Sequence, residues 1–228
     1  MKLAWQQIPS TIISELLCNI ELDGVVIDTE HSAFNIETLY NCIQIITALN
    51  KTCFVRLTEP SKTIARACLD AGAHGIIFST VETEEQCETI HQICKFPSQG
   101  GRRGLGLVRQ NKWGIEKLIS DKPIIIAQIE TVEGIENLDK IVSFDFDYYM
   151  IGPYDLSASL GIPAEFDNPK FLEAIAKVKE TITDNSQMAV HIPTDVDKHI
   201  DKYCDYGIIA VGMDTTILIE GYKEITNA

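Results

Sequence analysis

Short apolar runs alternate with longer amphipathic stretches along the whole chain. Runs of four to six mostly apolar residues are typical of parallel strands that are buried on both faces. Eight such runs are predicted as strands, at residues 2–5, 24–28, 52–56, 75–78, 124–129, 146–151, 188–192 and 207–211.

The stretches between these runs have helical periodicity, with apolar residues recurring every three or four positions. They predict helices at residues 9–18, 35–48, 61–71, 82–93, 132–141, 170–184, 194–204 and 215–225. Residues suited to begin a helix precede three of them, at Pro60-Ser61, Thr83 and Thr194-Asp195.

Eight strands alternating with eight helices in 228 residues predict the α/β class, and within it a (β/α)8 TIM barrel that forms one domain over residues 1–228. A doubly wound open sheet is the main alternative. Its dinucleotide-binding version is disfavoured, because no GxGxxG motif follows an early strand.

The net charge and the cysteine content indicate which binding partners and which cellular compartment to expect. The formal net charge is −14, so neither nucleic acid nor an anionic membrane is an expected partner. The seven cysteines are odd in number and scattered, which favours unpaired thiols in the cytoplasm. We expect no signal peptide, and no apolar run approaches the roughly 18 residues of a membrane span.

Ionisable and polar side chains gather where the predicted strands end. Buried strand ends need no charge for packing, and active sites of barrels lie at the carboxyl ends of the strands. The side chains in question are Asp28 and His31 after the second strand, Arg56 in the third, Gln128 and Glu130 in and after the fifth, and Asp155 after the sixth.

Glu130 and Asp155 are candidate ligands of a metal ion. They lie 25 residues apart, about one strand-helix unit, so both are expected at the rim of neighbouring strands. Two carboxylates and water suit a hard cation such as Mg²⁺ or Mn²⁺. Alternatively, either residue caps the helix that follows it.

His31 and Arg56 are candidate catalytic residues. A carboxylate such as Asp28 near His31 would orient the imidazole as a general base, although an ordinary surface histidine fits equally well. Arg56 would bind a substrate carboxylate or enolate oxygen, or form a structural ion pair. His191 ends a strand and is a weaker candidate for the same pocket.

Two further features bear on the chemistry. Residues 96–114 form an unusually long Gly- and Arg-rich segment, as functional loops often do. No lysine is expected inside the barrel, since Lys51 and Lys122 precede strands at its opposite end. Imine formation on a lysine is therefore disfavoured relative to metal-assisted chemistry.

Several motifs resemble the HpcH/HpaI class II pyruvate aldolases, which include 2-keto-3-deoxy sugar-acid aldolases. The resemblance runs in order over nearly the whole chain, through GVVIDTEHSAFNIETL, FVRLTEP, GGRRGLG, AQIETVEGIENLDKI, YYMIGPYDLSASLG and IIAVGMDTTIL. It implies a metal-dependent carbon–carbon lyase that joins or separates pyruvate and an aldehyde, acting on a 2-keto-3-deoxy or 4-hydroxy-2-keto acid.

The resemblance also implies roles for individual residues. Glu130 and Asp155 would hold Mg²⁺ or Mn²⁺, with Co²⁺ as another possibility, and Arg56 would bind the keto or enolate oxygen. His31, paired with Asp28, would move the hydroxyl proton. The implied substrate-binding residues are Gln128, Gly152, Pro153, Gly212, and Arg102 and Arg103 on the aldehyde side.

The resemblance leaves some alternatives open. Ser79 stands near an expected proline, and Tyr154 stands where a small residue is common, so the aldehyde is not determined. A CoA-ester lyase of the citrate-lyase-β or malyl-CoA type and a non-catalytic barrel remain alternatives. A trimeric or hexameric homo-oligomer is implied through residues 215–225, whose apolar face (Ile217, Leu218, Ile219) is equally explained by packing on the barrel.

Overall fold

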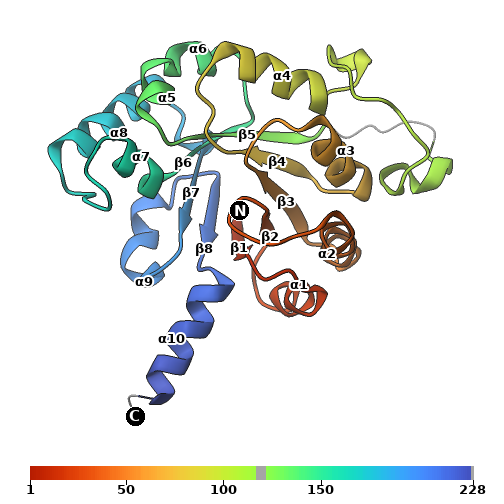
Figure 1. Cartoon of the computed structure of the whole chain (residues 1–228), viewed down its shortest axis with the longest axis horizontal. Helices are drawn as coiled ribbons and strands as arrows, with labels where there is room; N and C mark the ends of the chain where they lie inside the picture. The colour runs from red at the N-terminus through yellow and green to blue at the C-terminus, as the bar shows by residue number, and fades with distance from the viewer. Residues whose placement is uncertain (117–121, 227–228) are drawn as a thin grey trace.

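A closed parallel barrel forms the centre of the protein. The computed structural model describes residues 1–116 and 122–226, and Figure 1 shows the barrel with its helices outside. Each strand pairs with the next in chain order, and β8 pairs with β1 to close the sheet. The strands are β1 (Lys2–Gln6), β2 (Gly24–Asp28), β3 (Thr52–Leu57), β4 (Gly75–Phe78), β5 (Ile124–Ile129), β6 (Tyr148–Ile151), β7 (Met188–Ile192) and β8 (Ile208–Val211).

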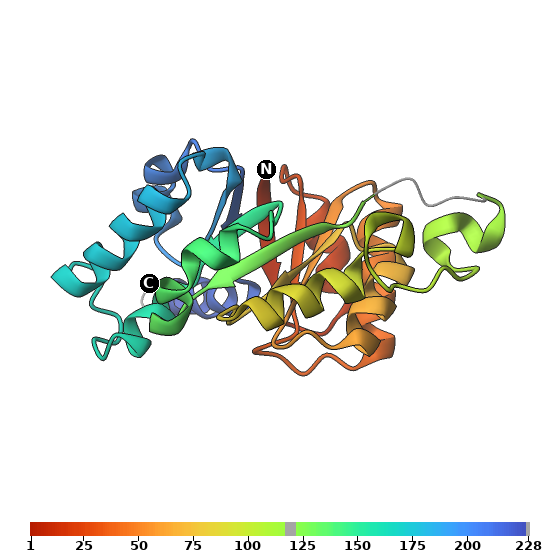
Figure 2. The ribbon, with the colours of Figure 1, turned by 90° about the horizontal axis from the view of Figure 1, so that it is seen from above.

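Helices connect the strands and, with the exception of the C-terminal one, cover the outside of the barrel (Figures 1 and 2). They are α1 (Thr11–Cys18), α2 (Ile36–Ala48), α3 (Lys62–Ala71), α4 (Glu84–Cys94), α5 (Val132–Glu136), α6 (Leu138–Val142), α7 (Pro153–Ser159), α8 (Pro169–Thr181), α9 (Val196–His199) and α10 (Asp214–Thr226). Ser61 and Thr83 cap α3 and α4 by accepting backbone hydrogen bonds. The predicted (β/α)8 barrel is confirmed.

Two predicted helices are divided in the structure, and one short helix was not predicted. The helix predicted at 132–141 is two short helices that meet at Asn137, whose side chain donates to the backbone oxygen of Glu82. The helix predicted at 194–204 is the short α9 followed by a 3-10 turn. Helix α7 was not predicted, because its seven residues are too few to show a clear period.

The interior of the barrel is a packed apolar core. Side chains of a strand alternate between its two faces, so every second residue points into the barrel. The inward-facing residues form one cluster of buried side chains: Leu3, Trp5, Val26, Phe54, Ile77, Ile126, Met150, Ala189, Ile208 and Ala210. The barrel is therefore filled below the ends of the strands, and a ligand can enter only above this core.

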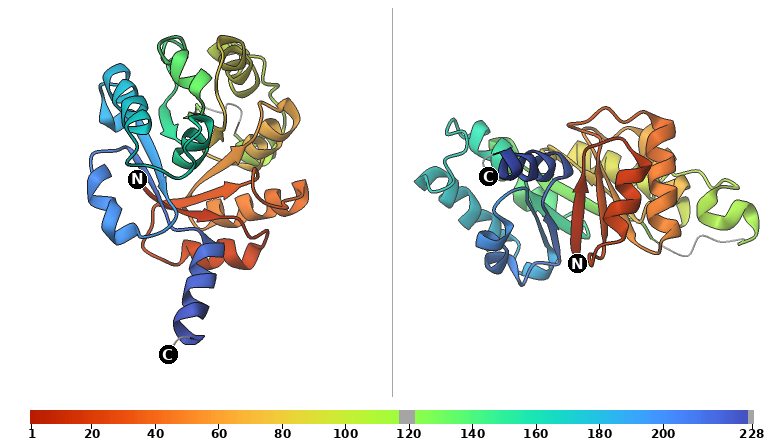
Figure 3. Two further views of the ribbon diagram at one scale, coloured as in Figure 1. Left: turned by 60° about the vertical axis from the view of Figure 1, so that its left-hand side comes forward. Right: turned by 90° about the horizontal axis from the view of Figure 1, so that it is seen from below.

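Helix α10 differs from the other long helices, because it leads away from the barrel to the C-terminus (Figures 1 and 3). Its apolar side chains are exposed, including Ile217 at 55%, Ile219 at 55% and Tyr222 at 69%. The alternative that this apolar face packs on its own barrel is thus wrong. Over the described ranges, no helix is long and apolar enough to cross a membrane.

Candidate active site

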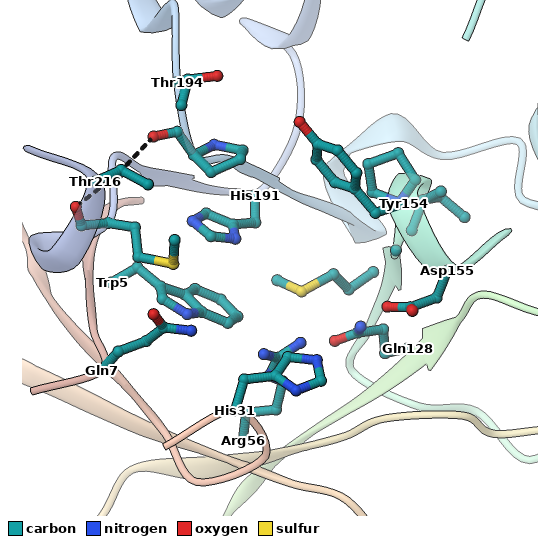
Figure 4. A pocket seen from close by; sticks show the side chains of 16 residues that line it. Trp5, Gln7, His31, Arg56, Gln128, Tyr154, Asp155, His191, Thr194 and Thr216 are labelled. Carbon is teal, nitrogen blue, oxygen red and sulfur yellow. Dashed lines mark hydrogen bonds between the residues drawn. The ribbon is translucent and has the colours of Figure 1, made fainter. Parts of the chain in front are cut away.

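A pocket of about 340 Å³ lies at the carboxyl ends of the strands, where Figure 4 shows its side chains. Its volume is in the range of small-molecule sites. The lining residues come from seven of the eight strands or the segments that follow them: Trp5, Gln7, His31, Arg56, Gln128, Met150, Ile151, Gly152, Pro153, Tyr154, Asp155, His191, Pro193, Thr194, Met213 and Thr216. Predicted residues from distant parts of the sequence therefore meet in one place.

The alternation of the strands explains why these side chains face the pocket. Phe54, Ile126 and Ala189 belong to the barrel core, and residues two positions later on the same strands are Arg56, Gln128 and His191. A step of two residues keeps the side chain on the inner face and moves it about 7 Å toward the carboxyl end. The polar residues thus form a layer directly on top of the apolar core.

Arg56 is fixed by two carboxylates in this layer. Its Nε and Nη2 donate to Oδ1 and Oδ2 of Asp28 at 2.9 and 2.7 Å, and its Nη1 lies 2.9 Å from Oε2 of Glu30. Burial raises the pKa of Asp28, but the bonds and charge of Arg56 outweigh it and lower that pKa to about 2. Asp28 therefore stays ionised, and the guanidinium keeps one N–H on each of Nη1 and Nη2 for a ligand.

The side chain of His31 does not pair with Asp28 as expected. The carboxylate of Asp28 is occupied by Arg56, by Nε1 of Trp5 and by Nε2 of Gln7. Only the backbone N–H of His31 donates to Asp28, at 3.4 Å, while the imidazole Nε2 lies 4.0 Å from Oε2 of Glu30. The correction follows from the bidentate geometry of arginine, which uses both oxygens of Asp28.

Glu130 lies behind the pocket surface, next to Asp155. It is 2% exposed, and its Oε1 accepts from the backbone N and the Oγ1 of Thr80 at 2.7 and 2.8 Å. Its Oε2 accepts from Nε2 of Gln128. Burial raises the pKa of Glu130, and the charges of Glu30 and Asp155 raise it further. The carboxylates therefore repel one another, which a bound cation would relieve.

The donor set at this point suits a hard divalent cation. Glu130 and Asp155 supply carboxylate oxygens, and the buried Oε1 of Gln128 has no hydrogen-bond partner among the described residues. No group of three or more His, Cys, Asp or Glu side chains is arranged for metal binding in residues 1–116 and 122–226. Two carboxylates with an amide and water ligands are sufficient for Mg²⁺ or Mn²⁺, which keep several waters.

Gly152, directly after β6, lies against the side chain of Glu130. A Cβ at this position would overlap Oε2 of Glu130 and lie 3.0 Å from Nε2 of Gln128. The glycine therefore makes room for the buried carboxylate, and Pro153 then begins α7, which carries Asp155 on its first turn. Gly212 directly follows β8, and its backbone oxygen lies 2.9 Å from Nε2 of His191.

Arg102 and Arg103 do not line the pocket. They lie between α4 and β5, and a helix-to-strand connection returns the chain to the amino-terminal end of the barrel. Arg103 is 2% exposed and donates from Nη2 to Asp70 and Gln110 at 2.8 and 2.7 Å. We expected these arginines to shape the aldehyde side of the pocket. Within one copy of the chain this expectation is wrong, because both lie away from the pocket.

Sequence reasoning missed several residues of the site. Trp5 and Gln7 at the end of β1 contact Asp28, and Thr80 contacts Glu130. The same inner-face alternation would have found Trp5, since Leu3 two residues earlier is in the core. Thr80 has a φ of 53°, a left-handed conformation that the sequence of a non-glycine residue does not reveal.

The chain is similar to known aldolases over most of its length. The chain is 30% identical to the hydroxypyruvate/pyruvate aldolase of Roseobacter denitrificans, over 97% of this chain and 89% of that protein. It is 29% identical to the 2-keto-3-deoxy-L-rhamnonate aldolase of Klebsiella pneumoniae, over 93% of this chain and 82% of that protein.

A solved structure has the same fold. A HpcH/HpaI aldolase/citrate lyase family protein from Burkholderia cenocepacia matches with a TM-score of 0.89 at 22% identity, covering all of this chain and 93% of that one. The profile of the HpcH/HpaI aldolase/citrate lyase family matches residues 5–221. The chain therefore belongs to the HpcH/HpaI aldolase/citrate lyase family.

Proposed function

We propose that this protein is a divalent-metal-dependent aldolase that cleaves or forms the carbon–carbon bond between pyruvate and an aldehyde. The enzyme is a carbon–carbon lyase, and its substrate is a 2-keto-3-deoxy or 4-hydroxy-2-keto acid. The observation that carries the proposal is one pocket in which Arg56, Gln128 and Asp155 meet above the apolar core, with Glu130 buried beside them.

Glu130 and Asp155 would hold the cation, with Gln128 beside them. Mg²⁺ and Mn²⁺ fit the oxygen donors best, and Co²⁺ is a further candidate. A divalent cation bound there would polarise the keto group and stabilise the negative charge of the enolate. It would also offset the local excess of carboxylates, which otherwise repels an anionic keto acid.

Arg56 would add the second positive group at the keto oxygen. Its two unpaired N–H groups are held in place by Asp28 and Glu30, so the guanidinium need not reorganise when charge develops. The backbone around Gly152 and Pro153 lines the same pocket and would face the substrate carboxylate.

His31 would move the proton of the substrate hydroxyl, directly or through a water molecule. Its side chain is 58% exposed at the pocket, so the imidazole can exchange protons with solvent. In cleavage, the base removes the C4 hydroxyl proton, the C3–C4 bond breaks, and the aldehyde leaves. Protonation of the remaining enolate at C3 gives pyruvate.

A homo-oligomer, trimeric or hexameric, completes the proposal. The exposed apolar side chains of α10 are unfavourable in water and would be covered by another copy of the chain. A further exposed set lies between α4 and β5, with Leu107 at 76% and Ile115 at 82% exposed. We also propose a cytoplasmic location, which the seven unpaired cysteines support.

Pyruvate release from candidate keto acids tests the function. The assay uses the metal-stripped protein with added Mn²⁺ or Mg²⁺, with EDTA, and with Glu130→Ala. Glu136→Ala is the matched control, because Glu136 is an exposed carboxylate on α5. We expect metal-dependent release that Glu130→Ala reduces at least about 100-fold and Glu136→Ala leaves unchanged.

Failure of the assay would be informative. If folded, metal-loaded protein releases pyruvate from no candidate acid, the aldolase proposal is wrong. Cleavage of a CoA ester by the same preparation would then identify a CoA-ester lyase, and inactivity on both classes would indicate a non-catalytic barrel.

A further inference from the structure

His191 lies in the pocket but has no role in the proposed reaction. It is on the inner face of β7, two residues after the core residue Ala189. Its imidazole stacks on the indole of Trp5, with ring centroids 4.0 Å apart and an interplanar angle of 9°. Figure 4 shows the two rings together, away from Gln128 and Asp155.

The stack holds the imidazole in one orientation. Nε1 of Trp5 donates to Oδ2 of Asp28 at 3.3 Å, and the guanidinium of Arg56 lies 4.8 Å from the indole centroid. The indole is therefore fixed by the same ion pair that positions Arg56. Because the imidazole lies parallel to this indole, its plane is set as well.

The hydrogen bond to Gly212 determines which nitrogen carries the proton. Nε2 of His191 lies 2.9 Å from the backbone oxygen of Gly212, which can only accept, so Nε2 is the donor. Burial lowers the pKa of His191 to about 4, with Arg56 contributing, so the ring is neutral near pH 7. In the neutral ring with the proton on Nε2, Nδ1 is an acceptor.

Two polar neighbours on this side of the pocket, Thr216 and Gln7, are already bonded. Thr216 Oγ1 donates to the backbone oxygen of Met213 at 2.8 Å. Gln7 donates from Nε2 to Asp28 and accepts at Oε1 from Thr215. Within the described part of the chain, no hydrogen bond is formed by Nδ1 of His191, and because His191 lines the pocket, Nδ1 is available to accept one from a bound molecule.

We propose that Nδ1 of His191 accepts a hydrogen bond from a hydroxyl group of the aldehyde portion of the substrate, and that this contact selects hydroxylated aldehydes over their deoxy counterparts. This inference rests on the proposed aldolase function, because it concerns the part of the substrate away from the pyruvyl group. An acceptor fixed by a stacked ring and a backbone bond recognises a hydroxyl without reorganising.

The test is the aldol addition of pyruvate to two aldehydes that differ by one hydroxyl group, glycolaldehyde and acetaldehyde. The variant is His191→Phe, which keeps a planar ring on Trp5 and removes both nitrogens. The quantity measured is the ratio of kcat/KM for the two aldehydes, compared between variant and wild type, since the comparison cancels their intrinsic reactivities. We expect this ratio to fall roughly fivefold, the size of one lost neutral hydrogen bond.

Two further variants make the test specific. His191→Gln retains a donor for Gly212 and an acceptor for the hydroxyl, so it should preserve more of the ratio than His191→Phe. His199→Phe makes the same substitution at an exposed position outside the pocket and should leave the ratio unchanged. The folding of each variant is checked by thermal unfolding.

The outcomes separate this inference from the function it rests on. If wild type adds pyruvate to neither aldehyde, the proposed function fails. If wild type is active and His191→Phe keeps the wild-type ratio, only the role of His191 is overturned. Where His191→Phe does not fold, His191→Leu takes its place, and a wild-type ratio in that variant overturns the role of His191 as well.

Discussion

Two buried arginines, Arg56 and Arg103, have similar immediate surroundings at opposite ends of the barrel. Each pairs with an aspartate, Asp28 for the first and Asp70 for the second, with the closest atoms 2.7 and 2.8 Å apart. Each guanidinium also lies near an aromatic ring, 4.8 Å from the centroid of Trp5 and 4.6 Å from that of Phe96.

The two arginines differ in what lies beyond the ion pair. Arg56 lines a pocket at the carboxyl ends of the strands, where further carboxylates, an amide and an imidazole converge. Arg103 is enclosed by α3 and by its own segment, where a chain returns from a helix to the next strand. A buried ion pair alone therefore does not identify a functional arginine, and its position along the barrel axis does.

The first prediction compares the same substitution, arginine to lysine, at Arg56 and at Arg103. Arg56→Lys should reduce kcat/KM at least about 100-fold, because a lysine cannot reproduce the paired donors that hold and present the guanidinium. Arg103→Lys should lower the melting temperature but change kcat/KM less than about threefold, since its role is packing and pairing. Steady-state kinetics and thermal unfolding of both variants provide the measurement.

An Arg103→Lys protein that is folded but as inactive as Arg56→Lys would contradict this comparison. It would mean that the segment between α4 and β5 reaches an active site in the assembled protein, as the Gly- and Arg-rich sequence first indicated.

The second prediction compares a glycine in each region. Gly152→Ala forces Glu130 to move, since the added Cβ overlaps its Oε2, and metal affinity should fall about 10- to 100-fold. Gly100→Ala meets no atom within 4 Å, but its φ of 86° strains an alanine, so it should cost about 1 kcal/mol of stability without affecting metal binding. Mn²⁺ titration and denaturant unfolding distinguish the two effects, and equal loss of metal affinity would refute the assignment of Gly152.

The third prediction concerns pH and uses a half-buried histidine from each region, His191 and His91. Burial lowers the pKa of both to about 4, below the usual value of about 6.5. The unfolded chain therefore binds more protons between these values, and stability falls as the pH drops from about 6.5 to 4. His191→Phe and His91→Phe should each reduce this fall in the free energy of unfolding, measured by urea denaturation across that range. An unchanged pH profile in either variant would show that the imidazole is not held neutral there.

Asp28 should act in the opposite direction and at lower pH. Its pKa is lowered in the fold, so its stabilising contribution is present above about pH 4 and is lost as the pH falls toward 2. The stability difference between wild type and Asp28→Asn should therefore shrink over that window, and a constant difference would argue against the Arg56 pair as the cause.

The fold was predictable because barrel strands are buried on both faces. The predicted bounds of β2, β4, β5 and β7 coincide with the structure, since each of these strands is mostly apolar. Strand β6 begins at Tyr148 rather than at residue 146, because the Asp147 carboxylate accepts from the backbone N of Ile125. Such a capping contact depends on a neighbouring strand and is not visible in a local pattern.

The site was predictable where a polar residue lies at the end of a strand or shortly after it. Arg56 and Gln128 lie on strands and His31 and Asp155 follow strands, and the structure brings all four together. The predicted side-chain pair of Asp28 and His31 is absent from the structure, because Arg56, Trp5 and Gln7 occupy the carboxylate of Asp28. Residues far apart in the sequence compete for this carboxylate, so the sequence alone does not show the outcome. Arg102 and Arg103 were misplaced because composition was weighed above the direction of the chain, which leads from a helix into a strand at that point.

The most direct test of the central claim is Mn²⁺ binding to metal-stripped protein, followed by electron paramagnetic resonance with and without pyruvate. The arrangement of Glu130 and Asp155 predicts one Mn²⁺ site per chain, tightened by pyruvate and lost in both Glu130→Ala and Asp155→Ala. Mn²⁺ binding that pyruvate does not affect, or that persists unchanged in both variants, would contradict a metal-dependent keto-acid site in this pocket.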